Sequence, residues 1–264
     1  MENKIKIKNA LISVFDKEGL EKIVKLLVSF NIEIYSTGGT EKFIKNHGIE
    51  VHQIEKLTSY PSILGGRVKT LHPKVFGGIL SRRNNSEDIK EVKKYQIPDF
   101  DLIIVDLYPF EETVRNNLSH NEIIEKIDIG GISLIRAAAK NFKDVIVVSQ
   151  RNQYKKIIEH LEKEGPHTDL NMRKDYACEA FNLSSHYDTM IFKYLNNDSK
   201  SVFKESIKDS KDLRYGENPH QKGIYFGNLN EIFDKLNGKE LSYNNLLDID
   251  AAVNLISEFE ETTF

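Results

Sequence analysis

Two adjacent glycines in the segment Ser36-Thr37-Gly38-Gly39-Thr40 follow a short apolar run and open a helical pattern. Glycine lets backbone N–H groups approach an anion closely, and the N-terminus of a helix favours negative charge. Lys17 follows the first apolar run, so in a parallel sheet it reaches the same edge. These residues indicate a phosphate site. The alternatives are an ordinary strand–helix turn with Thr40 as its cap, and a solvated Lys17.

The segment Gly65–Pro73 (GGRVKTLHP) carries three basic side chains directly after two glycines. Arg67 can hold a phosphate or carboxylate through two parallel hydrogen bonds. Lys69 can neutralise a developing oxyanion. The alternatives are a basic surface loop and, for His72, a structural hydrogen-bonding role.

Tyr108 stands at the end of another apolar run, directly before Pro109. Proline disfavours a helical backbone in the residue before it, so this pattern predicts that the strand stops here with the tyrosine hydroxyl at the sheet edge. The alternative is an aromatic side chain that packs on the following helix.

Asp128 precedes Gly130 and Gly131, and a helical run ends near Lys140. A carboxylate at a helix start can act as a general base or as a cap, and a lysine in the last turn can move a proton or interact with the helix dipole. Together with the segments above, these residues indicate a site for a phosphorylated substrate and acid–base chemistry.

Alternating strand and helix patterns position these residues. Such alternation predicts an α/β fold with a parallel sheet covered by helices on both faces. The stretch His52–Lys74 lacks either pattern, and a long irregular connection in a compact domain is usually functional. The expected strands are Ala10–Phe15, Ile32–Tyr35, Val75–Leu80, Leu102–Leu107 and Val145–Val148, and the expected helices are Gly19–Phe30, Thr40–His47, Tyr154–Glu164 and Met172–Tyr194.

The pattern also predicts how the chain is divided. A first domain covers 1–198, with a core at about 8–150 and a helical extension at 151–198. The polar stretch Asn196–Lys211 contains a linker at 199–211, and 212–264 is too short for a confident core of its own.

Composition excludes several classes of protein. The 264 residues carry a net charge of −3, so no basic field favours nucleic acid. The single cysteine, Cys178, excludes an internal disulfide framework and a cysteine zinc site, and it suits a reducing cytoplasm. The N-terminus lacks a signal-peptide pattern, and no apolar stretch approaches the roughly 20 residues needed to span a bilayer.

The chain resembles the IMP cyclohydrolase domain of the bifunctional purine-biosynthesis enzymes over about residues 8–196. The motifs that carry the resemblance occur in the family's order: SVFDKEGL, STGGT, LGGRVKTLHPKVFGGIL, DLYPF, IDIGG and LIRAAAKN. Two later segments, Leu213–Gln221 and Leu241–Asp248, resemble the opening of the AICAR transformylase region.

The resemblance implies a methylglyoxal-synthase-like fold and the dehydrative closure of 5-formamido-AICAR (FAICAR) to IMP, without metal or cofactor, in a cytoplasmic homodimer. The family often has Asn where Asp106 stands; if this side chain contacts the nucleotide, the aspartate lacks the hydrogen-bond donor of Asn and adds a negative charge. The resemblance implies catalytic roles for Lys69, Tyr108, Asp128 and Lys140, and substrate contacts from Ser13, Lys17, Ser36, Gly39, Thr40, Arg67, Thr70, Gly130 and Gly131.

For the transformylase region, Arg214, Tyr215 and Asn245 match nucleotide-binding positions of the family. That reaction uses 10-formyltetrahydrofolate and a Lys-His pair, and the sequence stops at Phe264, about where the pair's motif would begin. We therefore expect 212–264 to be an N-terminal fragment of the transformylase domain with an incomplete site.

Three other functions are compatible with parts of this pattern. A methylglyoxal-synthase-like lyase would act on a small triose, which the long GGRVKTLHP loop does not favour. A non-catalytic phosphate-ligand module would not need the four catalytic positions together. An interaction fragment would use apolar surface exposed by the second unit.

Overall fold

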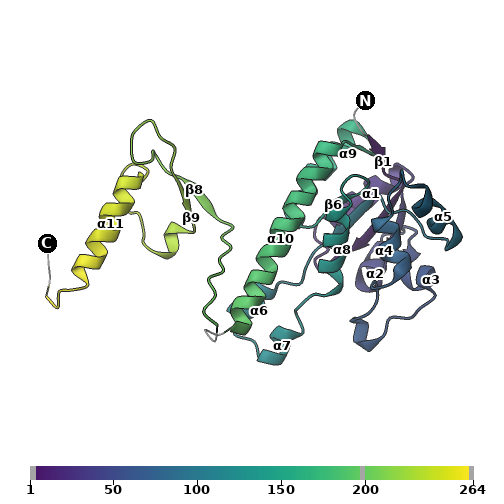
Figure 1. The fold of residues 1–264 in the computed structure, drawn as a ribbon, viewed down its shortest axis with the longest axis horizontal. Coiled ribbons are helices and arrows are strands. Elements are labelled where there is room, and N and C mark those ends of the chain that lie inside the picture. Colours follow the sequence, from purple (N-terminus) through teal and green to yellow (C-terminus); the bar gives the residue numbers. More distant parts are fainter. Residues whose placement is uncertain (1–3, 197–199, 262–264) are drawn as a thin grey trace. The chain divides into compact units, whose positions relative to one another are not determined.

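The computed structural model describes residues 4–196 and 200–261 and divides the chain into two compact units, Met1–Ser201 and Val202–Phe264 (Figure 1). The boundary expected between 198 and 199 lies outside the described residues. The end of the expected 199–211 linker belongs to a short strand, β8 (Ser210–Asp212).

A parallel five-stranded sheet forms the centre of the first unit, which confirms the predicted α/β fold. The spatial order β4-β3-β2-β5-β6 places the first strand of the sheet, β2, next to β5. The direction in which the chain winds reverses at this pair, and open parallel sheets bind ligands at such a point, beyond the carboxyl ends of the strands. The strands are β2 (Asn9–Ser13), β3 (Glu33–Ser36), β4 (His52–Gln53), β5 (Leu102–Val105) and β6 (Ile146–Val148).

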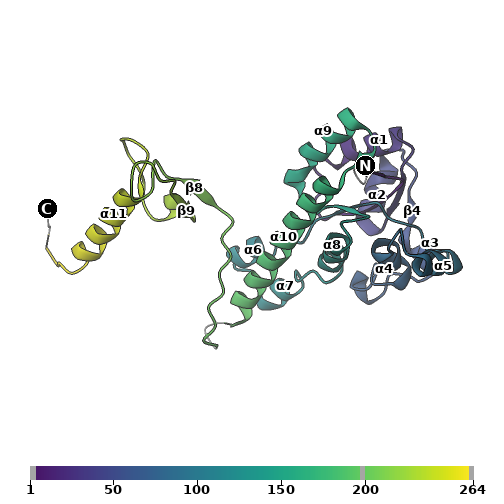
Figure 2. The same cartoon turned by 45° about the horizontal axis from the view of Figure 1, so that its top comes forward.

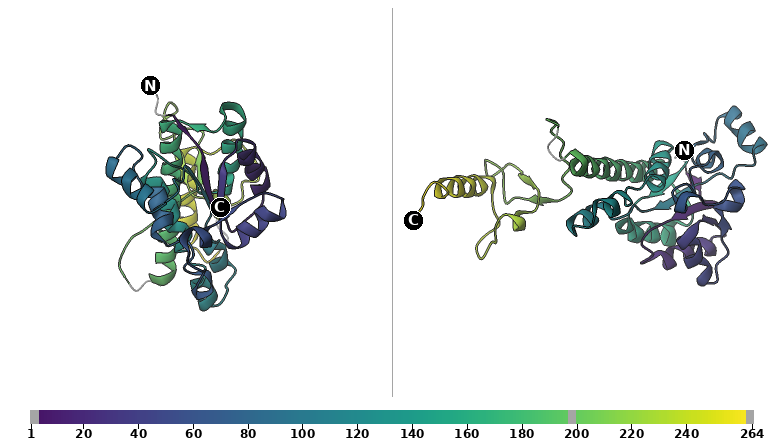
Figure 3. Two further views of the ribbon diagram at one scale, coloured as in Figure 1. Left: turned by 90° about the vertical axis from the view of Figure 1, so that its right-hand side faces the viewer. Right: turned by 90° about the horizontal axis from the view of Figure 1, so that it is seen from below.

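Side chains alternate between the two faces of the sheet, as the period of a β-strand requires. In β2, Ala10 and Ile12 join one core cluster and Leu11 joins the other. Figure 3 shows the purple strands between helices on either side, and Figure 2 shows α10 running beside α8. The first cluster includes residues of α1 (Leu20–Ser29), α2 (Gly38–Asn46) and α9 (Tyr154–Glu164); the second includes residues of α3 (Ile54–Thr58), α4 (Pro73–Leu80), α8 (Gly130–Lys140) and α10 (Leu170–Asn196).

The strand expected at Val75–Leu80 is wrong, because these residues form helix α4. Pro73 occupies the first turn, and the His72 ring accepts the N–H of Lys74 at 3.1 Å, so the histidine caps the helix. Val75 and Ile79, four positions apart, are the fully buried pair. Their helical spacing, rather than the β-branched composition, decides the local structure.

The stretch His52–Lys74, expected to be irregular, holds β4, α3 and one turn of 3₁₀ helix, η1 (Leu64–Gly66). Gly65 and Gly66 both have positive φ, at 65° and 91°. These glycines turn the loop that carries Arg67 and Lys69 back toward the sheet edge.

Short elements complete the first unit. Phe110, Ile123 and Tyr187 form a third buried cluster that packs α6 and α7 against α10. These elements are β1 (Ile5–Lys6), which pairs with β7 (His167–Thr168), α5 (Ser86–Lys94), α6 (Phe110–Arg115), α7 (His120–Ile124) and η2 (Arg151–Gln153).

The second unit contains the antiparallel pair β8 and β9 (Ile224–Phe226), a 3₁₀ turn η3 (Leu229–Glu231) and helix α11 (Tyr243–Ile256). Within its described part, Leu229 is the sole buried hydrophobic side chain, and Leu236 is 95% exposed. This unit therefore exposes much of its apolar surface, as its length suggested.

Candidate active site

Asp106 ties together the ends of the two strands at the switch point. Its carboxylate accepts the N–H of Phe15 and, at 3.0 Å, the N–H of Asp16, both just beyond β2. Burial raises the pKa of Asp106, although these two N–H groups oppose the shift. The side chain that departs from the family's usual Asn thus holds the loop after β2 to the end of β5.

Two lysines converge on the first turn of α2. A Cβ added at Gly38 would lie 3.1 Å from the Lys69 Nζ, and one added at Gly39 would lie 3.8 Å from the Lys17 Nζ. Lys17 also donates to the carbonyls of Val14, at 2.9 Å, and Phe15, at 2.6 Å. Two ammonium groups beside the free N–H groups of a helix start form a strong anion site.

Ser36 and Thr40, both expected to contact substrate, bind the end of β2 through their hydroxyls. The Ser36 hydroxyl donates to the Ile12 carbonyl at 2.7 Å, and the Thr40 hydroxyl exchanges hydrogen bonds with the N–H and carbonyl of Val14. Both side chains are almost fully buried. They fix the walls of the anion site, next to Ser13 at the end of β2.

Asp128 lies just before α8, and its carboxylate accepts the N–H of Gly131 at 2.7 Å. Burial raises the pKa of this carboxyl; the Gly131 N–H and the Lys69 charge lower it, and the charge of Asp106 raises it. A half-buried carboxylate with a raised pKa is a stronger base than a free aspartate, which suits the role of a general base.

Tyr108 follows β5 at the same edge, partly exposed. Its ring meets the Phe15 ring edge-on, with centroids 5.0 Å apart, and the Lys126 ammonium lies 5.4 Å from the Tyr108 centroid. Burial raises the pKa of Tyr108, and the charges of Asp128 and Asp106 raise it further. The sequence pattern does not single out Phe15 and Lys126, since a lone aromatic and a lone lysine carry no spacing signal.

The basic loop reaches the start of α8 from the other side. The Arg67 guanidinium pairs with Glu125, and a Cβ on Gly130 would lie 3.4 Å from the buried Thr70 Oγ1. A Cβ on Gly66 would come within 2.8 Å of the Lys69 Cε. The loop is thus packed so that Lys69 extends toward α2 and its charge acts on Asp128.

Lys140 is the one expected catalytic residue that the chain does not bring to this cluster. It is the last residue of α8, whereas Asp128 precedes the first turn. At 1.5 Å per residue, the helix separates them by about 15 Å. Within a single chain, Lys69, Tyr108 and Asp128 gather around the switch point and Lys140 lies at the opposite end of α8.

Comparison with known proteins gives matches along the whole chain. Residues 19–133 match the MGS-like domain family, and residues 138–264 match the AICARFT/IMPCHase bienzyme family. The bifunctional purine biosynthesis protein PurH of Bacteroides thetaiotaomicron is 56% identical over 100% of this chain. The chain belongs to this family.

Other relatives agree with this assignment. PurH of Clostridium perfringens is 47% identical over 97% of the chain, and the chain spans about half the length of these relatives (52%). The crystal structure of ForH has a TM-score of 0.63 and 32% identity, and the match covers 71% of this chain and 96% of ForH.

The second unit contains the three residues for which the resemblance implies nucleotide contacts. The Arg214 guanidinium lies 4.9 Å from the Tyr215 ring centroid, and the Asn245 side chain accepts the Ser242 N–H at 3.1 Å to cap α11. A hydrogen bond with Ser242 and the charge of Arg214 lower the pKa of Tyr215. Tyr215 and Asn245 thus both interact with Ser242, and Arg214 lies against Tyr215.

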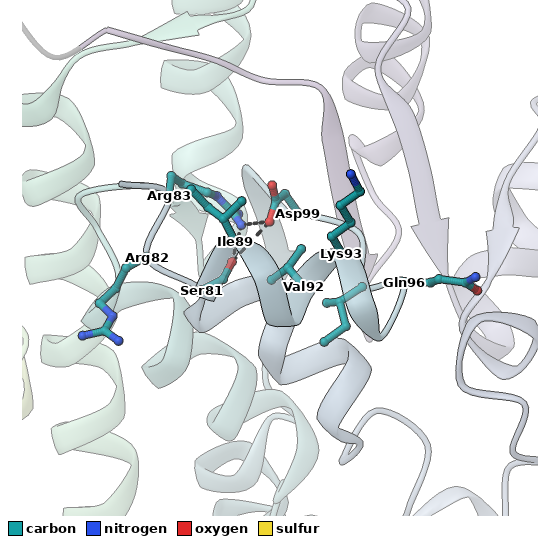
Figure 4. Close-up of a pocket in the computed structure, with 9 residues that line it drawn as sticks. Ser81, Arg82, Arg83, Ile89, Val92, Lys93, Gln96 and Asp99 are labelled. Carbon is teal, nitrogen blue, oxygen red and sulfur yellow. Dashed lines mark hydrogen bonds and ion pairs between the residues drawn. The ribbon is translucent and has the colours of Figure 1, made fainter. Parts of the chain in front are cut away.

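A hollow of about 340 Å³ between the end of α4 and α5 contains none of the expected site residues (Figure 4). Arg83 there pairs with Asp99 and donates to the carbonyls of Phe100, at 2.9 Å, and Gly78, at 3.1 Å. Arg83 thus links α4 to Phe100, just before β5.

Among residues 4–196 and 200–261, no group of three His, Cys, Asp or Glu side chains is arranged to hold a metal ion. Within the same described ranges, no helix has the length and apolar character needed to cross a bilayer.

Proposed function

We propose that this chain is an IMP cyclohydrolase, which closes FAICAR to IMP with loss of water. Membership of the PurH family supplies the pathway. The observation that carries the proposal is a carboxylate with a raised pKa, Asp128, beside Tyr108 and Lys69 at the edge that also holds the anion site. A phosphorylated substrate bound there would present its ring to an acid–base pair.

The reaction removes one proton from the carboxamide nitrogen and one from the formamido nitrogen, and it releases the formyl oxygen as water. The carboxamide nitrogen of the substrate attacks its formyl carbon, so a C–N bond forms while the nitrogen gives up a proton. Asp128 takes that proton, because its carboxylate is held by the Gly131 N–H in one orientation. The formyl oxygen takes up this proton and the one lost from the formamido nitrogen and leaves as water, and loss of the formamido proton forms the C=N bond that completes the new ring.

Positive charge and a hydroxyl stabilise the negative oxygen that forms during the attack. Lys69 supplies the charge, and Tyr108 stays protonated because its pKa is raised, so it can donate a hydrogen bond. Lys17, Gly39 and the first turn of α2 hold the phosphate, and Arg67 and Thr70 close the loop over the ribose. Since both reacting groups belong to one substrate, positioning contributes much of the acceleration.

For Lys140 we propose a homodimer in which this residue serves the site of the second copy. The resemblance gives Lys140 a catalytic role, yet about 15 Å of helix separates it from Asp128 in its own chain. A lysine side chain cannot span that distance. A partner subunit resolves the discrepancy and agrees with the homodimer that the family suggests.

We further propose that 1–198 is the cyclohydrolase domain, 199–211 its linker, and 212–264 part of the transformylase domain, in a cytoplasmic protein. The cyclisation balances without metal or cofactor. In the full-length family the transformylase reaction uses 10-formyltetrahydrofolate, and Arg214, Tyr215 and Asn245 would contact its nucleotide substrate. We assign only the cyclohydrolase reaction to residues 1–264.

Product analysis separates this proposal from its rivals. The chain is incubated separately with FAICAR and with dihydroxyacetone phosphate, and the products are identified by mass spectrometry. We expect IMP from the first and no methylglyoxal from the second. Methylglyoxal would indicate the lyase instead, and binding of FAICAR without any product would indicate the non-catalytic phosphate-ligand module.

A further inference from the structure

The hydroxyl of Tyr187 joins helix α10 to the backbone that carries Asp128. It accepts the N–H of Asp128 at 2.8 Å and donates to the carbonyl of Lys126 at 2.9 Å. Tyr187 lies 59 residues from Asp128 in the sequence. One side chain therefore fixes both ends of the three-residue segment 126–128.

The tyrosine is itself held rigidly. It is 6% exposed, and its ring packs edge-on against the Phe110 ring with centroids 6.0 Å apart. Burial raises the pKa of Tyr187 to about 12, so the hydroxyl keeps its proton and its donor role at neutral pH. The anchor is a buried, neutral group with both of its hydrogen bonds made to backbone.

Both residues that Tyr187 holds belong to the candidate active site. Asp128 carries the carboxylate, and Lys126 extends its ammonium over the rings of Phe15, at 5.8 Å, and Tyr108, at 5.4 Å. Loss of the hydroxyl would leave the Asp128 N–H and the Lys126 carbonyl without this partner. The segment would then move, and the carboxylate would lose its fixed approach to the Gly131 N–H.

We infer that Tyr187 is a positioning residue, which acts through Asp128 and Lys126 to hold the general base and the cation over Tyr108 in their working arrangement. This inference rests on the proposed function. Both hydrogen bonds of the Tyr187 hydroxyl go to the backbone of 126–128, so its effect on the site passes mainly through that backbone.

Helix α10 offers a matched control. Tyr176 lies on the same helix and is 1% exposed, and among the described residues its hydroxyl has no hydrogen-bond partner. Tyr176→Phe and Tyr187→Phe therefore remove the same atom from equally buried sites, but only the second breaks a link to Asp128.

Three measurements on the full chain test the inference. In Tyr187→Phe we expect kcat for IMP formation to fall roughly 10- to 100-fold with KM nearly unchanged, because the phosphate is held by other elements. We expect faster hydrogen exchange at the Asp128 amide. The acid limb of the pH–kcat profile should move to higher pH. Asp106, Lys69 and the Gly131 N–H all act on the pKa of the Asp128 carboxyl, and the variant weakens only the hydrogen bond from Gly131, which lowers that pKa.

Tyr176→Phe should leave all three measurements close to wild type. A Tyr187→Phe variant with the kcat, acid limb and amide exchange of Tyr176→Phe overturns the inference while the proposed function stands. A wild-type chain that forms no IMP overturns both, and it is distinguished by the absence of activity in every variant.

Discussion

The Asp128 carboxylate and the Gly131 backbone are in such close contact that no side chain fits between them. The carboxylate Oδ1 accepts the Gly131 N–H at 2.7 Å, and a Cβ built on Gly131 would lie 2.5 Å from the Asp128 Oδ2. Gly131 lies in a regular helix without a positive φ, so its backbone conformation does not require glycine. The close approach of the Asp128 carboxylate requires it.

Gly131→Ala should therefore displace the carboxylate without unfolding the protein. Alanine favours a helix by about 1 kcal/mol over glycine, which offsets part of the strain. We expect IMP formation to fall about 100-fold or more and the melting temperature to change by only a few degrees. Gly130→Ala should lose less activity, because its Cβ would meet Thr70 Oγ1 at an ordinary 3.4 Å. Equal losses in the two variants would refute this role of Gly131.

The pH dependence of the reaction should report the raised pKa of Asp128. The base must be ionised, so kcat/KM should rise with pH through a limb above 3.8, the ordinary value for an aspartate. Asp106→Asn removes a charge that raises this pKa, so the limb should move to lower pH. A limb that stays in place would show that Asp106 does not act on the base.

Lys17 should contribute to binding rather than to chemistry. In Lys17→Ala we expect KM for FAICAR to rise about 10- to 100-fold with kcat retained, because one charged contact to the phosphate is lost. Lys22→Ala is the control: it also removes a lysine, but this one pairs with Glu162 on the surface. Steady-state kinetics distinguish the cases, and a loss of kcat alone in Lys17→Ala would contradict the phosphate assignment.

Mixing two inactive variants tests the shared site. Asp128→Asn and Lys140→Ala are each expected to be inactive. If each site takes Asp128 from one copy and Lys140 from the other, random mixed dimers regain about a quarter of wild-type activity, since half of the dimers carry one intact site. Activity after subunit exchange is measured by IMP formation. No recovery, with exchange confirmed by labelled subunits, would place both residues in one chain or remove Lys140 from the reaction.

Much of the fold follows from local pattern. The continuous apolar run at Ala10, Leu11 and Ile12 predicts a strand buried on both faces, and its side chains do alternate between the two cores. The glycine segments follow the ends of strands or precede helices, as their composition predicts. The prediction of a strand at Val75–Leu80 is wrong because a short β-branched and glycine-containing run does not distinguish a strand from a packed helix. There, Gly78 allows close approach to Pro98, whose carbonyl would lie 2.2 Å from a Cβ.

The site is predictable only in its sequence-local parts. Lys69, Tyr108 and Asp128 each follow or precede a recognisable turn, so their common edge can be anticipated. The roles of Tyr187 and Lys126 cannot be anticipated from the sequence, because they depend on how α10 packs against a segment 59 residues earlier. The separation of Asp128 and Lys140, by contrast, follows from helix rise alone.

The most direct test of the central claim follows IMP absorbance after FAICAR is mixed with the wild-type chain and with Asp128→Asn. Because the pKa of Asp128 is raised in the folded chain, ionisation of this carboxyl lowers the free energy of unfolding as the pH rises through that pKa. Asp128→Asn removes this cost, so the variant should be as stable as the wild type at neutral pH, or more stable. We predict steady IMP formation by the wild type and, from a folded Asp128→Asn, a rate lower by about 1,000-fold or more. Near-equal rates from the two proteins, or no IMP from the wild type, would contradict the account.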